Sequence, residues 1–130
     1  MTPPRSTPAR RVVIAIDGPA ASGKSSTAKW VAERLGFTHV DSGALYRAAT
    51  AAYLRGRGAN DEKKWTEADV VAAAKGHVKL APADRSLVPF LDDAPADAEI
   101  RGGEVTQHVS AVARMKTVRN WVNQQVRDAA

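Results

Sequence analysis

Cysteine is absent from the sequence, and so is any long apolar run. Without cysteine there can be no disulfide, thiol nucleophile or cysteine-bound zinc site, which fits a reducing compartment, so we expect a cytoplasmic protein. No apolar run approaches the roughly 20 residues that a membrane-spanning helix needs, so we expect no membrane partner. The first residues also lack a charged start followed by an apolar stretch, so we expect no secretory signal.

The residues that are present are typical of a single globular domain. The chain has 130 residues, of which 44% are hydrophobic and 25% are charged. Its net charge of +5 favours anionic partners, without choosing between nucleotides and nucleic acids. Residues 1–11, MTPPRSTPARR, cannot supply a core face, so we expect a flexible basic tail there. Three arginines without interleaved aromatic residues are a weak nucleic-acid signal. We therefore expect no nucleic-acid partner, and binding through the tail remains an alternative.

A strand and a helix are predicted at the start of the folded part. Residues 12–16, VVIAI, are wholly apolar, which is typical of a parallel strand buried on both faces. From Lys24 onward one apolar stripe predicts a helix, and Gly36 stands where a glycine stop is expected. The stripe consists of Ala28, Val31, Ala32 and Leu35. This order is the first half of a βαβ unit.

A second strand and helix follow. Residues 37–40 predict a short strand, and Asp41 or Ser42 can cap the next helix. That helix ends near the turn at residues 56–58, and its apolar residues share a face: Leu45, Ala48, Ala49 and Ala52.

The remaining residues predict further helices and a hairpin. A helix begins after a polar loop at Thr66, and residues 77–80 and 87–91 look like two strands of a hairpin. A turn at 92–97 leads to a short strand at 98–101. Spaced valines then mark two helices, one containing Val105, Val109 and Val112, the other Val118, Val122 and Val126. The fold class is therefore α/β, and we see no internal repeat.

The clearest chemical signal is the pattern G-x-x-x-x-G-K-[ST], which residues 18–25, GPAASGKS, match at every fixed position. Glycines let the backbone curl until its N–H groups face a polyphosphate, and the following helix adds its positive end. Lys24 would reach the β- and γ-phosphates, and Ser25 would bind Mg²⁺. The motif lies between an apolar strand and an amphipathic helix, which is the context that this interpretation requires.

Other polar residues give weaker signals. His39, His77 and His108 lie far apart and lack metal-ligand spacing, so we interpret them as surface or core histidines. On residue type alone, Asp41-Ser42-Gly43 and Arg47 can be a helix cap with a solvated arginine or a phosphate site, and the two interpretations stay open.

The sequence resembles the bacterial cytidylate kinase family. The resemblance rests on IDGPAASGKSS at 16–26 and VDSGALYRA at 40–48, followed by two blocks at 100–105 and 110–119. It covers nearly all of residues 12–127, and the DSGALYR block separates this chain from adenylate, guanylate and shikimate kinases.

The resemblance implies a phosphotransferase that moves the γ-phosphoryl of ATP to CMP or dCMP. It implies a P-loop three-layer α/β/α fold with a parallel sheet over residues 12–130. A helical part that binds the nucleoside monophosphate and a small antiparallel insert would lie at about 59–115, with the insert itself near 76–100. The full-length enzyme would be a monomer, with ATP as donor and Mg²⁺ as cofactor.

The resemblance also implies roles for particular residues. Lys24 is the expected catalytic residue and Ser25 the expected Mg²⁺ ligand. Ser42 and Arg47 would hold the phosphate of the acceptor, and Ser110 and Arg119 would read its cytosine. The donor phosphates would lie on Gly18, Pro19, Ala20, Ala21, Ser22, Gly23, Lys24, Ser25 and Ser26.

The chain departs from the family pattern in three places. Lys116 stands where a proline is common, and Val126 replaces a usual glutamine. The sequence ends at Ala130, where the family continues into a Gly-Arg-Asp strand and an arginine-rich lid, so we expect this chain to lack the C-terminal part. Two hypotheses follow: a cytidylate kinase, or a truncated fragment that binds nucleotide phosphates without turnover.

Overall fold

The computed structural model describes residues 24–57, 62–83 and 86–129. The predicted strand at 12–16 and the glycine loop before Lys24 lie outside these residues. The described elements are helices and short strands, in the order α1 (Lys24–Leu35), β1 (His39–Val40), α2 (Ser42–Arg57), η1 (Glu62–Lys64), α3 (Glu67–His77), β2 (Val78–Ala83), β3 (Ser86–Leu91), β4 (Ala94–Pro95), α4 (Asp97–Ile100), α5 (Gly103–Ala113) and α6 (Lys116–Ala129).

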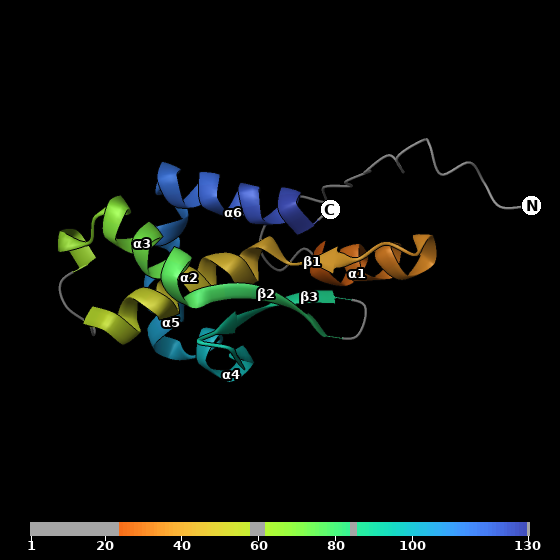
Figure 1. The fold of residues 1–130 in the computed structure, drawn as a ribbon, viewed down its shortest axis with the longest axis horizontal. Helices are drawn as coiled ribbons and strands as arrows, with labels where there is room; N and C mark the ends of the chain where they lie inside the picture. The colour runs from red at the N-terminus through yellow and green to blue at the C-terminus, as the bar shows by residue number, and fades with distance from the viewer. Residues whose placement is uncertain (1–23, 58–61, 84–85, 130) are drawn as a thin grey trace, which may run out of the picture.

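Helix α2 lies at the centre of the molecule (Figure 1). Helices α3, α5 and α6 pack around it, and the sheet lies on its remaining side. The predicted apolar face of α2 is confirmed, because Leu45, Ala48 and Ala49 are fully buried and Ala52 is 1% exposed. The small alanines let the neighbouring helices approach closely, and larger side chains such as Ile100, Val112 and Val118 complete the core.

The sheet is built around β3. Strand β2 pairs antiparallel with β3, with Val78 opposite Leu91 and Ala83 opposite Ser86. The other edge of β3 is shared: β1 pairs parallel with Ser86 and Leu87, and β4 pairs antiparallel with Phe90 and Leu91. Pro89, which has no N–H to donate, lies between the residues that pair with β1 and those that pair with β4.

The predicted hairpin is confirmed, and three details of the sequence prediction are wrong. His77 is the last residue of α3, and the strand begins at Val78. The strand predicted at 37–40 spans only His39 and Val40, and its parallel pairing with β3 is the one parallel contact of an otherwise antiparallel described sheet. The strand predicted at 98–101 is instead the helix α4, because Asp97 and Glu99 favour its first turn and Ile100 alone needs burial.

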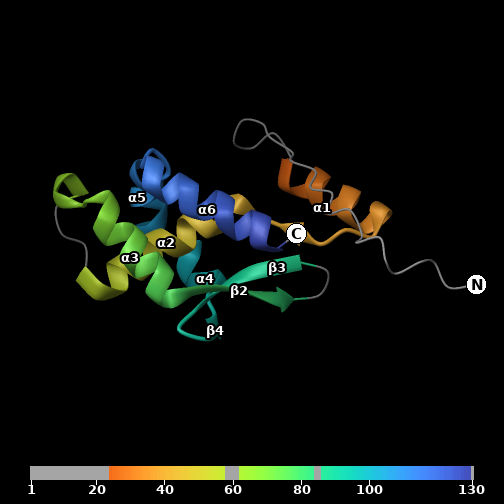
Figure 2. The ribbon, with the colours of Figure 1, turned by 45° about the horizontal axis from the view of Figure 1, so that its top comes forward.

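Helix α1 lies beside β1, away from η1 and α3 (Figure 2). Its predicted glycine stop is confirmed, because Gly36 has a φ of 69° that a side chain would disfavour. Of its apolar stripe Ala32 is buried, whereas Leu35 is 54% exposed. The neighbouring Trp30 is also exposed, and the guanidinium of Arg34 lies 5.0 Å from its ring centroid. Among the described residues, no helix is long and apolar enough to cross a bilayer.

Candidate functional site

A hollow of about 760 Å³ lies where α1, α2, β3 and the α4–α5 junction meet. Strand β3 forms one wall with Ser86, Leu87, Val88 and Pro89, which include the stretch of its edge between β1 and β4. The polar residues that line the hollow come from segments far apart in the sequence: Ser26, Lys29, His39, Asp41, Arg47, Asp97, Arg101 and Thr106.

The start of α2 borders this hollow. The Asp41 carboxylate accepts a hydrogen bond from the Ala44 N–H at 3.3 Å, so Asp41 caps the helix. This agrees with the helix-cap interpretation of residues 41–43. A side chain at position 43 would place its Cβ 3.2 Å from that carboxylate oxygen, a tight contact that the glycine avoids. Ser42 is exposed at the first helical position, and it does not line the hollow although both of its neighbours do.

Arg47 projects from α2 into the same region. Its Nη1 donates to the Ile100 carbonyl at 3.2 Å and to the Thr106 hydroxyl at 3.0 Å. A guanidinium carries five N–H donors in a planar fork. The Nε–H and the two N–H groups on Nη2 make no hydrogen bond to any residue that the structure describes. This free edge matches the two-oxygen face of a phosphate or carboxylate.

Two further cations line the hollow. Lys29 comes from α1, and Arg101 follows α4 directly. Within residues 24–57, 62–83 and 86–129, neither side chain makes a hydrogen bond or ion pair. Asp41 and Asp97 are the acids of the lining, and Asp41 is already engaged as a helix cap. Unpaired basic groups around a hollow of this size favour an anionic ligand.

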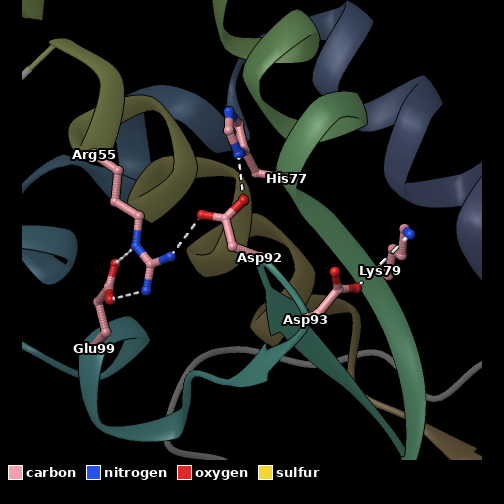
Figure 3. A network of polar contacts seen from close by, with 6 residues as sticks. All are labelled: Arg55, His77, Lys79, Asp92, Asp93 and Glu99. Carbon is pink, nitrogen blue, oxygen red and sulfur yellow. Dashed lines mark hydrogen bonds and ion pairs between the residues drawn. The ribbon is translucent and has the colours of Figure 1, made fainter.

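A network of charged residues outside the hollow connects α4 to α2 and to the turn after β3 (Figure 3). Arg55 of α2 makes a two-point contact with Glu99, at 2.7 Å from Nε and 2.6 Å from Nη2, and its Nη1 donates to Asp92 at 2.8 Å. Asp92 also accepts from His77 Nδ1 at 2.5 Å. The hydrogen bond from His77, and then that from Arg55, lower the pKa of Asp92 below its ordinary value. The network does not line the hollow, so we assign it a structural role.

The structure brings only part of the predicted site together. Ser26 and Arg47 line the hollow, and Lys24 and Ser25 begin the helix that carries Ser26. Ser110 and Arg119 are exposed on α5 and α6 and do not line it, so their predicted role in reading cytosine stays a prediction. The remaining predicted phosphate residues lie outside the described part: Gly18, Pro19, Ala20, Ala21, Ser22 and Gly23.

Several residues of the lining were not predicted as site residues, among them Lys29, Arg101 and Thr106. Lys29 is four positions after Ser25, one helical turn on, and helical spacing could have placed it near the phosphate loop. Arg101 directly follows α4, where the sequence prediction had a strand at 98–101, whereas Thr106 lies in α5, which was predicted as a helix. Because α4 was predicted as a strand, the sequence could not place Arg101 at the hollow. The contact of Thr106 with Arg47 depends on the packing of α5 against α2, which helical spacing alone does not indicate.

Comparison with known proteins gives one consistent family. A family model described as cytidylate kinase matches residues 14–130. The cytidylate kinase of Lysinibacillus sphaericus is 44% identical over 111 residues, 85% of this chain and 48% of the relative. Those of Leuconostoc mesenteroides and Pelodictyon phaeoclathratiforme are 41% and 40% identical, over 86% and 85% of this chain and 49% and 46% of theirs. The chain thus spans about half the length of the curated relatives it matches.

Proposed function

This chain belongs to the cytidylate kinase family, and on that premise we propose that the whole protein transfers the γ-phosphoryl of ATP to CMP or dCMP. An oxygen of the acceptor phosphate forms the new bond to the γ-phosphorus while the bond to the β–γ bridging oxygen breaks, which gives the nucleoside diphosphate and ADP. The observation that carries this proposal is the hollow that Ser26 of α1 and Arg47 of α2 line together. Donor and acceptor phosphates must meet in such a shared space.

The donor side of the proposal rests on the start of α1. Lys24 opens this helix, whose N-terminal N–H groups and dipole favour a polyphosphate bound by residues 18–26. The Lys24 ammonium would neutralise charge that develops on the transferring group, while Lys29 adds a cation on the same helix. Catalysis in phosphoryl transfer is mostly positioning and charge stabilisation, and the chain has the residue types for both.

The acceptor side rests on Arg47. Its Nε–Nη2 edge, which bonds to no residue that the structure describes, suits the phosphate of a nucleoside monophosphate, and Ser42 lies five residues before it on the same helix. Arg101 also lines the hollow and adds positive charge to it. We propose that Ser110 and Arg119 read the cytosine, which requires the α5–α6 region to approach the bound acceptor.

Mg²⁺ would fit this site as an ion that is bound mainly by the substrate phosphates. No group of three or more carboxylate or histidine side chains that could hold a metal occurs among the described residues. A Mg²⁺ ion keeps several waters and is commonly held by substrate phosphates with one or two protein oxygens. Ser25 would supply such an oxygen, and the ion would neutralise the phosphate charge.

We propose the corresponding architecture for the whole protein. Residues 12–130 would form part of a P-loop three-layer domain, with the monophosphate-binding part and the antiparallel insert at about 59–115. The protein would be a cytoplasmic monomer that works on free nucleotides. The alternative function is nucleotide-phosphate binding without turnover.

A coupled assay of ADP release separates the two functions. With ATP, Mg²⁺ and CMP, we expect ADP release that depends on CMP and falls by at least about a hundredfold in Lys24→Ala, because removing one preorganised charge contact costs that much. Lys75→Ala, which alters an exposed lysine of α3 that does not line the hollow, is the matched control. ATP binding without CMP-dependent release, in the unsubstituted chain and the control alike, would favour the binding module.

A further inference from the structure

Thr106 is a polar residue of the hollow to which neither the sequence motifs nor the family resemblance gives a role. It lies in the first turns of α5, and its hydroxyl accepts the hydrogen bond from Arg47 Nη1 at 3.0 Å. The same hydroxyl donates to the Gly102 carbonyl at 2.9 Å. Because its own hydrogen is used in that bond, the hydroxyl oxygen is fixed as an acceptor for Arg47.

The bonds that Thr106 and Ile100 make with Arg47 fall on a single nitrogen. The Ile100 carbonyl accepts from Nη1 at 3.2 Å, so the two N–H groups of Nη1 are matched by two acceptors. A guanidinium is planar, so fixing Nη1 also fixes the direction of the Nε–Nη2 edge. Both acceptors come from the α4–α5 region, more than fifty residues from Arg47 in sequence, and so the edge is set by tertiary structure.

We propose that Thr106 is a positioning residue that orients Arg47 for the phosphate of a nucleoside monophosphate. This inference rests on the proposed function and adds to it how the acceptor arginine is held before substrate arrives. An arginine that is already oriented loses less conformational freedom on binding, so affinity increases without a new contact to the ligand. Thr106 itself touches no substrate in this proposal.

Two substitutions test the role of the hydroxyl. Thr106→Val keeps the β-branched shape and removes the oxygen, whereas Thr106→Ser keeps the oxygen. Calorimetric titration of each chain with CMP and with cytidine separates phosphate recognition from base and sugar recognition. We expect Thr106→Val to bind CMP about tenfold more weakly, since a hydrogen bond to a charged group contributes on that scale. Cytidine affinity stays unchanged, and Thr106→Ser binds CMP like the unsubstituted chain.

A double-mutant cycle with Arg47→Ala tests whether Thr106 acts through Arg47. Once the guanidinium is absent, Thr106→Val is expected to cause no further loss of CMP affinity. A merely structural role would persist in that background and would weaken cytidine binding and the thermal midpoint as well. Thr106 is exposed, so the midpoint of Thr106→Val is expected to stay close to that of the unsubstituted chain.

The outcomes distinguish this inference from the function it rests on. The unsubstituted chain is expected to bind CMP more tightly than cytidine. If it does, but Thr106→Val binds CMP with the same affinity as the unsubstituted chain, the positioning role is overturned and the proposed function stands. Equal weakening for CMP and cytidine, or a serine variant as weak as the valine variant, also overturns it. If the unsubstituted chain binds CMP no better than cytidine, the phosphate site fails, and the proposed function fails with it.

Discussion

At the scale of single residues, Asp92 shows how one side chain serves a turn and a charge network together. Asp92 and Asp93 have φ values of 49° and 66°, and they form the two-residue connection between β3 and β4. Such a hairpin turn needs two left-handed residues, a conformation that Asp and Asn tolerate. In this position the Asp92 carboxylate meets His77 and Arg55, and Asp93 lies 3.8 Å from Lys79 Nζ (Figure 3).

We expect Asp92→Asn to lower stability at neutral pH and to abolish part of the acid sensitivity. The pKa of Asp92 is lowered in the folded protein, first by the His77 hydrogen bond and then by Arg55. Its stabilising effect is therefore complete above the ordinary value of 3.8 and is lost as the pH falls through the lower folded-state pKa. Thermal midpoints measured from pH 7 to pH 2.5 should differ between the two proteins at pH 7 and converge below about pH 4.

Asp93→Asn is the matched control for that substitution. It alters the next residue of the same turn, which also has a positive φ, and its ion pair with Lys79 is long and exposed. Its midpoints are expected to follow those of the unsubstituted chain. If both substitutions gave the same pH profile, the turn and not the charge network would explain the effect.

At the scale of elements, the start of α3 is hydrogen-bonded to the start of α6. The Glu67 carboxylate of α3 accepts a hydrogen bond from the Thr117 N–H at 2.8 Å, in the first turn of α6. The first N–H groups of a helix have no partner within it, so α3 supplies the cap that α6 needs. This bond, chiefly with the Thr117 backbone, lowers the pKa of Glu67.

Glu67→Ala is expected to loosen the start of α6. Amide exchange of Thr117 should become faster at neutral pH, because its acceptor is gone. Glu67→Gln keeps an acceptor and is expected to retain most of the protection, with less dependence on pH below the ordinary pKa of 4.5. Unchanged Thr117 exchange in the alanine variant would show that water replaces the carboxylate without cost.

The sequence predicted the long helices well and the shortest elements poorly. α2, α5 and α6 each carry enough apolar residues for their spacing to show, and α3 was predicted from its start at Thr66. α4 has four residues and buries chiefly Ile100, which gives no periodicity to read. Its helical form depends on contacts from α2, because so short a helix is not stable alone.

At the scale of the whole molecule, the buried face of α2 is the common core of the helices and the sheet. Leu45 is fully buried in it near the start of α2, next to Ala44, which lines the hollow. The candidate site was predictable only in part, because tertiary packing brings some of its residues together. Arg47 could be found from a sequence block, but Lys29, Arg101 and Thr106 join it only through packing of distant segments.

We expect Leu45→Ala to destabilise the protein by about 2–5 kcal/mol, because it leaves a cavity in a fully buried site. Leu35→Ala is the control, since Leu35 is 54% exposed. Its effect is expected to stay within about 0.5 kcal/mol. Urea denaturation of both variants measures the difference, and equal midpoints would contradict the burial assigned to Leu45.

Helix α2 holds α4 at two points, and the distance between them has a consequence for insertions and deletions. Arg47 binds the Ile100 carbonyl, and Arg55 binds the Glu99 carboxylate, so two residues eight positions apart meet two adjacent residues of one short helix. Each helical residue turns the chain by about 100°, so one residue added or removed between them would swing one arginine away from α4. The length of this part of α2 is therefore more constrained than the identity of its exposed side chains.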